Sequence, residues 1–510
     1  MLKFLKIFFL SLFLFSIYLL FSCSPNKSNI TYTKEKPLIE PDYNEIIIPP
    51  NICPLNFCIK EKGNAYFVKI YGKKGKSINI LSHKKLIKIP IKKWHKILGL
   101  NLGDTINIEI IVKKNFHNWV RYQPLSIFIA SDSIDPVIVY RKIDPGFRFW
   151  NKMGIFQRNI ETFNEIPIIS NQATRGNCMN CHSFNNHNPA KMLFHLRALN
   201  PGTIIIDNDK IQKVNLSTPY TMSYGVYPSW HPNKQYIAFS VNIIRQIFFA
   251  QFNHYIEVID YASDIVIYDY LKNIITTCGS LSTKLKENLP EWAPDGKHLY
   301  YILGDTSDDI KKNRYSLMRI PFDTNNLSFG QPEMLINADS VGYSISFPKI
   351  SPNNRFIVFC ALDFGYFAVN HRESDLWLFD ISNFKAKPLT KINSTESESY
   401  HSWSSNSRWL IFSSKRDDGF SSYPYICYID SFGNDYKPFL LPQKDPNYYK
   451  FIYSSFNVPE FVKGKVFFSL TKLKQIALNN KAKSVTFDSS VNIDGLSGAT
   501  WLAKKKNYPK

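Results

Sequence analysis

The sequence predicts an all-β protein with an N-terminal antiparallel β-sandwich-like domain and a C-terminal β-propeller of roughly six blades. Two patterns lead to this prediction. Residues from about 38 to 135 alternate between apolar and polar side chains, as half-buried strands do. After residue 195, strand-rich segments recur about every 50 to 60 residues, which is the period of propeller blades. A short motif of cysteine and histidine lies between the two regions.

The first residues have the features of an export signal. Lys3 and Lys6 precede a mostly apolar run that ends in Leu20-Phe21-Ser22-Cys23, and its length fits a signal peptide better than a membrane span. The end of the run resembles the lipobox of bacterial lipoproteins, which implies cleavage before Cys23 and acylation of its sulfur. Acyl chains would anchor the protein to a membrane. The alternative is an ordinary signal peptide with an unmodified Cys23.

No acidic cluster follows Cys23. In lipoproteins of the Bacteroidetes type, such a cluster resembles a surface-export signal. We therefore expect a lipid-anchored protein of the cell envelope, on the periplasmic face of the outer membrane.

The chain is basic, with 62 Lys and Arg against 41 Asp and Glu and a net charge of +21. The basic residues are distributed along the sequence, so we interpret the charge as a compositional bias that solvates the surface. Export also argues against a nucleic-acid partner. Cys53 and Cys58 are close enough in sequence to form a disulfide, but the sequence does not decide whether they do.

The motif between the two regions reads Cys178-Met179-Asn180-Cys181-His182. This Cys-x-x-Cys-His pattern is the attachment signature of a c-type haem. The two thiols would add to the haem vinyl groups, and His182 would be an axial ligand of the iron. Two alternatives stay open: a disulfide between Cys178 and Cys181, and a zinc site.

The zinc site would use both cysteines and two of His182, His187 and His195. For a single haem c, the sixth iron ligand would come from the residues after the motif. Met192 is our first choice, followed by His195 and then His187. Arg175 and Arg197 are candidates for pairing with the haem propionates, because a guanidinium group matches a carboxylate.

Four related segments define the repeat, and the positions Trp230, Trp292, Ile350 and Trp403 are 62, 58 and 53 residues apart. Each combines an aromatic or apolar residue, a proline or histidine, and then a strand. These segments resemble the repeat of TolB-type propellers, P-x-W-S-P-D-G followed by a strand and S-x-R-D-G. Ile350 and Ser405 depart from that pattern. The recurring tryptophans are expected to pack between blades. Segments 202–216 and 451–487 are expected to complete the propeller.

The predicted organisation follows the chain from end to end. It comprises a signal peptide (1–22), a flexible tether (23–37), the sandwich-like domain (38–135), a connector with the haem segment (136–194), the TolB-like propeller (195–500) and a tail (501–510).

No hydrolase motif is present: the sequence lacks G-x-S-x-G, a phosphate-binding loop and H-E-x-x-H. We therefore expect a non-enzymatic protein. The motifs together resemble a cytochrome–propeller lipoprotein of the Bacteroidetes type. This resemblance implies covalent haem with electron transfer or redox sensing, and a propeller that docks a periplasmic or envelope protein. The alternative is a propeller scaffold that binds an envelope protein, peptide or glycan. A haem enzyme with an open axial position is a third hypothesis.

Overall fold

The computed structural model describes residues 30–115, 118–145, 152–248, 256–305, 309–479 and 481–496, apart from the side chain of Cys181. The predictions for the signal peptide, for Cys23 and for the tail at 501–510 lie outside these residues. The chain divides into two compact units. Unit 1 consists of Met1–Ser131 with Pro442–Lys450, and unit 2 consists of Asp132–Leu441 with Phe451–Lys510.

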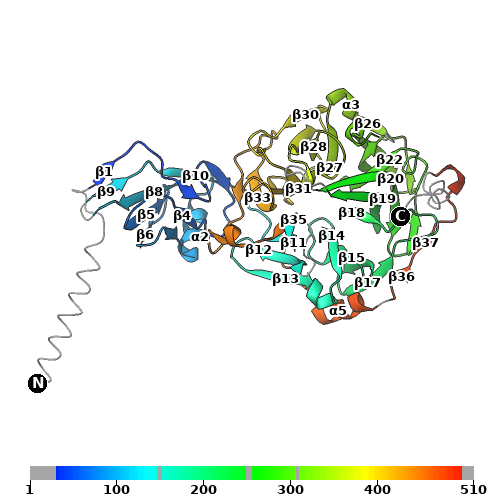
Figure 1. Ribbon diagram of the computed structural model, residues 1–510, viewed down its shortest axis with the longest axis horizontal. Helices are drawn as coiled ribbons and strands as arrows, with labels where there is room; N and C mark the ends of the chain where they lie inside the picture. Colours follow the sequence, from blue (N-terminus) through cyan, green and yellow to red (C-terminus); the bar gives the residue numbers. More distant parts are fainter. Residues whose placement is uncertain are drawn as a thin grey trace, which may run out of the picture. The chain divides into compact units, whose positions relative to one another are not determined.

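The described residues of unit 1 form a seven-stranded sheet, a three-stranded sheet, helix α2 (Ile91–Leu100) and most of the short helix α4 (Tyr448–Phe451) (Figure 1). The larger sheet contains β1 (Ile30–Tyr32), β3 (Ile46–Ile48), β5 (Ala65–Tyr71), β6 (Ile78–Ser82), β8 (Thr105–Lys113), β9 (Trp119–Arg121) and β10 (Leu125–Ile129). The smaller sheet contains β2 (Ile39–Glu40), β4 (Phe57–Ile59) and β7 (Leu86–Ile87). We predicted an antiparallel domain, but the strand pairs β1–β9 and β3–β10 are parallel.

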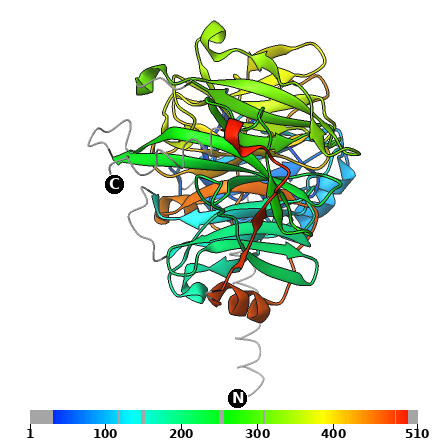
Figure 2. The ribbon, with the colours of Figure 1, turned by 90° about the vertical axis from the view of Figure 1, so that its right-hand side faces the viewer.

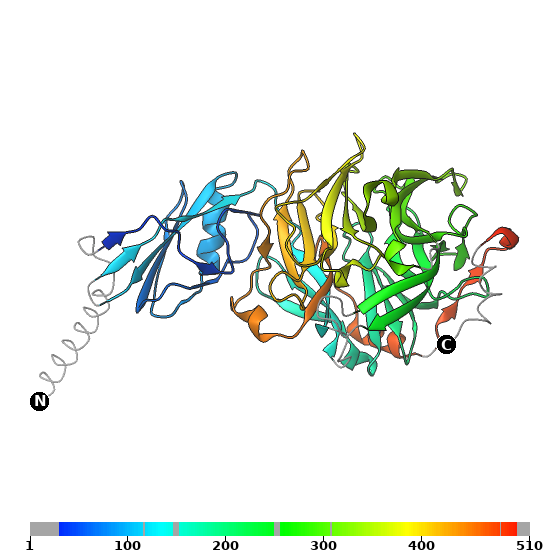
Figure 3. The ribbon, with the colours of Figure 1, turned by 45° about the horizontal axis from the view of Figure 1, so that its top comes forward.

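Helix α2 (Ile91–Leu100) was not predicted. It begins directly after Pro90 and buries Trp94, Ile97 and Leu98, whose spacing places them on one helical face. The indole Nε1 of Trp94 donates a hydrogen bond to the carbonyl oxygen of Ile52 at 3.1 Å. Figure 3 shows α2 lying among the strands of unit 1. Trp94 is therefore a core residue.

Unit 2 is built from six sheets whose innermost strands surround a common centre (Figure 1). Blade 1 is β14 (Cys178–Phe184), β15 (Lys191–Arg197), β16 (Gly202–Asp207) and β17 (Lys210–Asn215). Blade 2 is β18 (Val226–Trp230), β19 (Tyr236–Phe248), β20 (Ile256–Asp269) and β21 (Ile274–Thr276). Blade 3 is β22 (Lys286–Trp292), β23 (His298–Gly304), β24 (Tyr315–Asp323), β25 (Ser328–Phe329) and β26 (Glu333–Ile336).

The remaining blades complete the ring. Blade 4 is β27 (Ser344–Ile350), β28 (Phe356–Leu362), β29 (Asp375–Asp380) and β30 (Lys385–Pro388). Blade 5 is β31 (Glu398–Trp403), β32 (Trp409–Ser414), β33 (Tyr423–Tyr428) and β34 (Phe439–Leu440). Blade 6 is β35 (Ser455–Val462), β11 (Val137–Ile143), β12 (Gly154–Asn159) and β13 (Glu165–Ser170). The predicted fold class, an all-β chain with a propeller, is confirmed.

Blade 6 joins the two ends of the propeller. Its inner strand β35 comes from the C-terminal region and pairs antiparallel with β11 from the N-terminal region. Residues 136–194, which we treated as a connector, therefore contain the three outer strands of blade 6 and the first two strands of blade 1. The sequence did not reveal this arrangement because these strands lack the repeat motif.

The C-terminal segment also differs from the expected complete blade. We expected segment 451–487 to complete a blade, but residues 465–469 after β35 form no strand and helix α5 (Leu470–Leu478) follows them. The segment then adds the two-residue strands β36 (Lys483–Ser484) and β37 (Thr486–Phe487) to the outer edges of blades 1 and 2. Figure 2 shows this segment running along the outside of the propeller. Leu473 and Ala477 of α5 are fully buried in a core cluster.

Candidate functional site

Every inner strand of the propeller contains a β-bulge at the same place. Two residues of the inner strand are skipped in the pairing with the second strand, which marks a bulge. The skipped pairs are Cys181-His182, Tyr227-Pro228, Leu289-Pro290, Phe347-Pro348, Tyr400-His401 and Val458-Pro459. The bulge is therefore a property of the repeat and not of one blade.

The first bulge residue has a left-handed backbone in blades 2 to 6. The φ angles are 50° for Tyr227, 49° for Leu289, 47° for Phe347, 46° for Tyr400 and 52° for Val458. This conformation is unfavourable for a residue with a Cβ, at roughly 1–2 kcal/mol each. Bulges re-aim side chains, and all five of these residues line one central cavity.

The end of the haem-type motif occupies the corresponding position in blade 1. Cys181 is the first bulge residue of β14 and His182 is the second. The stretch from Cys181 to Phe184 thus aligns with Tyr400-His401-Ser402-Trp403 of blade 5. The motif is part of the innermost strand of a blade, whereas we expected it in a separate segment before the propeller.

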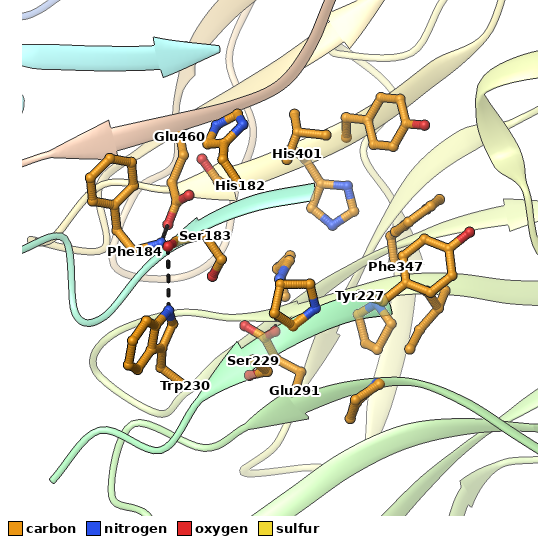
Figure 4. Close-up of a pocket in the computed structure, with 18 of the residues that line it drawn as sticks. His182, Ser183, Phe184, Tyr227, Ser229, Trp230, Glu291, Phe347, His401 and Glu460 are labelled. Atoms are coloured by element: carbon orange, nitrogen blue, oxygen red, sulfur yellow. Dashed lines mark hydrogen bonds and ion pairs between the residues drawn. The ribbon is translucent and has the colours of Figure 1, made fainter. Parts of the chain in front are cut away.

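The central cavity has a volume of about 470 Å³, within the usual size range of ligand pockets. Its lining is asymmetric. Blades 2, 4 and 5 contribute the aromatic residues Tyr227, Phe347, Phe367 and Tyr400. Blades 1 and 6, with the segments beside them, contribute a polar group that includes three cationic side chains: Arg141, His182, His187, Arg197, Glu460 and Lys463. Figure 4 shows part of this arrangement. Such a cavity can hold a flat molecule that is apolar on one part and anionic on another.

His182 is buried and lines the cavity. Neither ring nitrogen makes a hydrogen bond of good geometry within the described part of the chain. Burial, and secondly the charge of Arg141, lower its pKa to about 3, although the carbonyls of Val139 and Val458 oppose the shift. The imidazole is therefore neutral at pH 7, and neutral imidazole is the form that binds metals.

His401 occupies the same position in blade 5 and provides a direct comparison. Its Nε2 lies 2.8 Å from the carbonyl oxygen of Val358. Its Nδ1 lies 3.9 Å from the Sγ of Cys360. Burial lowers its pKa to about 3 as well. The two imidazoles are equally buried and neutral, but of the two only His401 makes a hydrogen bond of good geometry within the described residues.

Carboxylates lie beside the cationic residues of the cavity. Glu460 accepts a hydrogen bond from the backbone N–H of Phe184 at 3.1 Å (Figure 4). Burial raises the pKa of Glu460 to about 8, and the charge of Lys349 opposes the shift. Glu291 instead pairs with Lys349 at 2.7 Å. The carboxyl group of Glu460 is therefore mostly protonated at pH 7.

The structure separates the three candidates for the sixth iron ligand. Met192 is fully buried in a core cluster and does not line the cavity. His195 is buried as well, and its Nδ1 lies 2.8 Å from the hydroxyl oxygen of Thr203. His187 does line the cavity, where its Nδ1 lies 2.9 Å from the carbonyl oxygen of Phe461. Of the three, the fold brings only His187 to the cavity that His182 lines.

The other predicted residues are distributed as follows. The thiol of Cys178 is half-buried and is not among the cavity-lining groups, while the side chain of Cys181 lies outside the described part of the structure. Arg197 lines the cavity and Arg175 does not. Among the side chains that the structure describes, no cluster of three or more His, Cys, Asp or Glu is arranged to hold a metal ion. Cys53 and Cys58 are not bridged.

Sequence reasoning missed Arg141, Glu460 and the aromatic residues of the cavity. Arg141 lies on β11, which carries no repeat motif, and Glu460 lies on the strand that closes the ring. One signal was available, however. The similarity of Cys-His-Ser-Phe to Tyr-His-Ser-Trp would have identified the inner strand of blade 1. The residue before Pro or His in each repeat would then have indicated which residues line the cavity.

No protein-family model matches the chain, and no curated protein does either. Solved structures do resemble it. A TolB protein of Agrobacterium tumefaciens is 12% identical with a TM-score of 0.36, over 62% of this chain and 96% of that one. A hydrazine synthase chain of Kuenenia stuttgartiensis is 10% identical with a TM-score of 0.30, over 49% of this chain and 63% of that one.

A Bacteroides uniformis protein described as a 6-phosphogluconolactonase is 10% identical with a TM-score of 0.30, over 64% of this chain and 98% of that one. The chain has the fold of a six-bladed β-propeller. That statement rests on the topology of its own six sheets. Within the described residues, no helix is long and apolar enough to cross a membrane.

Proposed function

We propose that this protein is a c-type haem protein of the cell envelope that transfers electrons or senses a redox state, with the haem held at the centre of the propeller. One observation carries the proposal. The Cys-His pair of the motif occupies the bulge that lines the central cavity in the other blades, and within the described residues neither ring nitrogen of His182 makes a hydrogen bond of good geometry there.

The histidine, arginines and aromatic residues of the cavity support a bound haem, although the thiol of Cys178 does not itself line the cavity. His182 would be the axial ligand, since its imidazole is neutral and neither ring nitrogen makes a hydrogen bond of good geometry within the described residues. Cys178 and Cys181 would form the two thioether bonds. Tyr227, Phe347 and Tyr400 would contact the apolar ring. Arg141 and Arg197, both at the cavity, would pair with the propionates.

A bound haem supplies a reversible one-electron couple whose potential depends on its axial ligands and on burial. Within this proposal His187 replaces Met192 as the first candidate for the sixth ligand, because His187 lines the cavity and Met192 is enclosed in the core. Two imidazole ligands favour a lower potential than histidine with methionine. The lipid on Cys23 would hold the protein at the outer membrane, where the propeller would meet its redox partner.

The test is covalent haem attachment during export. The full chain is expressed with a c-type haem maturation system, and the mature protein is analysed by haem staining in a denaturing gel and by its pyridine haemochrome spectrum. We expect one covalent haem per chain. Cys178→Ser and Cys181→Ser should each shift the haemochrome band, since one thioether is lost, and the double variant should lose covalent haem.

Cys58→Ser is the matched control, because it removes a half-buried thiol in unit 1 and should leave the haem unchanged. A folded, exported wild-type protein without covalent haem would refute the proposal. The sixth ligand is decided by spectra of His187→Ala and Met192→Ala. Only His187→Ala is expected to change the axial ligation.

The aromatic residues of the cavity favour a second candidate function. Tyr227, Phe347 and Tyr400 lie close together, with ring centroids of neighbouring pairs 6.2 and 5.2 Å apart. Such a surface also suits an envelope peptide or glycan, which would make the protein a propeller scaffold. Under this alternative Cys181→Ser would leave partner capture from envelope extracts intact, and Tyr400→Ala would abolish it.

A further inference from the structure

Unit 1 contains a dense group of basic residues that the overall composition conceals. Residues 60–96 contain 12 lysines and one acidic residue, Glu61, which is a net charge of +11. The whole chain has a net charge of +21. More than half of the excess charge thus lies in 37 residues. This corrects our interpretation that the basic residues are evenly distributed.

Nine of these lysines belong to three segments that follow one another in the sequence. Lys73, Lys74 and Lys76 lie in the turn between β5 and β6; Lys84, Lys85 and Lys88 flank β7; Lys92, Lys93 and Lys96 lie on α2. All nine are exposed. We call them together the basic surface. On α2 the three lysines lie opposite the buried face of Trp94, Ile97 and Leu98.

The turn and the helix are held together by Asn101, which follows the last residue of α2. The Nδ2 of Asn101 donates to the carbonyl oxygen of Lys74, and the N–H of Lys74 donates to Oδ1, each at 3.0 Å. A Cβ at Gly75 would lie only 2.8 Å from Cδ1 of Leu100. The lysines of the turn therefore lie beside the end of the helix.

Few carboxylates neutralise the basic surface. Among the residues that the structure describes, Lys73 pairs with Asp104 at 2.9 Å, and the other eight lysines have no carboxylate within ion-pair distance. Nine like charges on a small domain repel one another, which an anionic partner would relieve. The surface is therefore complementary to an extended anionic partner and not to a single carboxylate.

Exposed leucines lie beside these lysines. Leu100 is 41% exposed and Leu102 is 52% exposed, and both lie at the C-terminal end of α2 next to the lysine turn. A basic surface with exposed apolar side chains is typical of proteins that lie on an anionic membrane, where lysines contact headgroups and apolar residues enter the interface. A polyanion such as nucleic acid would not use the leucines.

We propose that the basic surface of unit 1 binds the anionic headgroups of a membrane, with Leu100 and Leu102 inserted among them. The proposal is independent of the haem. It provides a second membrane contact, which a lipid-anchored protein would use to orient unit 1 on the bilayer.

The test uses the full mature chain with Cys23→Ser, so that acyl chains make no contribution. Sedimentation is measured with vesicles of phosphatidylcholine alone and with about 30% phosphatidylglycerol. We expect binding only to the anionic vesicles, weakened by salt. Because each lysine near an anionic surface contributes about fivefold in affinity, Lys92→Glu/Lys93→Glu/Lys96→Glu should lower binding roughly 100-fold or more.

The matched control is Lys311→Glu/Lys385→Glu/Lys474→Glu, which makes the same charge change at exposed positions of unit 2. It should retain binding within about threefold. Leu100→Asn/Leu102→Asn should weaken vesicle binding and leave binding to soluble heparin unchanged. Equal binding to neutral and anionic vesicles, an equal loss in both lysine triples, or binding to heparin without binding to vesicles would each overturn the proposal.

Discussion

At the scale of single residues, the most informative comparison is between His182 and His401. They occupy the same bulge position in two inner strands and both are buried and neutral. The ring of His401 satisfies the carbonyl of Val358, whereas the ring of His182 satisfies no partner with good geometry. A buried polar group without a hydrogen bond costs stability. The position of His182 at the cavity without such a bond is the basis for proposing it as a ligand.

This difference predicts that the same substitution costs less stability at His182 than at His401. His401→Leu leaves the carbonyl of Val358 without its partner and should lower the free energy of unfolding by about 1–3 kcal/mol. His182→Leu removes unsatisfied nitrogens and should cost less than about half of that amount. Urea unfolding of both variants in the haem-free protein measures the difference. An equal loss in both would show that His182 is a structural histidine.

A second residue-scale prediction concerns the tryptophans of the repeat. Trp403 is buried, and its Nε1 donates to the carbonyl oxygen of Lys349 in the preceding blade at 3.0 Å. Trp403→Phe should cost about 1 kcal/mol, because mainly the hydrogen bond is lost. Trp403→Ala should cost about 3–5 kcal/mol, because a large cavity forms. Thermal unfolding would contradict a structural role if both variants were as stable as the wild type.

At the scale of elements, the hairpin of β19 and β20 is distinctive. Its strands are 13 and 14 residues long, far longer than their counterparts in other blades. Asn242, Ile244 and Val258 from its extended part line the central cavity. Ile256 and Val258 are buried in a core cluster with residues of blades 3 and 4. The hairpin therefore crosses from its own blade to the neighbouring blades and walls part of the cavity.

A buried ion pair between His371 and Glu257 connects this hairpin to blade 4. The Nε2 of His371 lies 3.1 Å from Glu257 on β20, and its Nδ1 lies 2.8 Å from Glu373. Burial lowers the pKa of His371, but the two carboxylates outweigh burial and raise it to about 9. The imidazole is thus charged at neutral pH.

The raised pKa gives this contact a defined pH dependence. Below about pH 6.5 the folded and unfolded chains both hold the proton, so the stabilisation is complete; it is lost as pH rises from about 6.5 to 9. The free energy of unfolding of the wild type should fall across that window by about 2 kcal/mol more than that of His371→Gln. Chemical unfolding at several pH values measures both curves. Parallel curves for the wild type and His371→Gln would exclude the ion pair as the cause. His83→Gln, at an exposed position, is the control and should follow the wild-type curve.

At the scale of the whole molecule, the propeller is closed by strand β35. The two strands that meet in blade 6, β35 and β11, are separated by more than 300 residues in the sequence. Without β35 the strand β11 would become an exposed edge, and β14 would lose Glu460, which accepts from Phe184. Open edges promote association between chains.

Because β35 closes the ring of blades, a chain that lacks this strand should behave differently from the full chain. A chain that ends at residue 450 should lose cooperative unfolding and associate, since one inner strand of the ring is missing. Near-ultraviolet circular dichroism and light scattering measure these effects. A monomeric, cooperatively unfolding truncation product would show that five inner strands suffice. Phe461→Ala, which weakens the core at β35 without removing the strand, should remain monomeric.

The sequence by itself determined the all-β class, the repeat of the blades and the haem-type motif, because periodicity, turns and cysteine spacing are local features. Only the tertiary structure decided where the motif lies in the fold. The bulge that aligns Cys181 and His182 with Tyr400 and His401 is defined by pairing between strands. The cavity draws residues from all six blades, including Arg141 and Glu460, which no motif marks. Closure by β35 depends on a pairing across the chain that no local pattern contains. The cavity is formed by several strands together, whereas a local sequence pattern describes only one strand at a time.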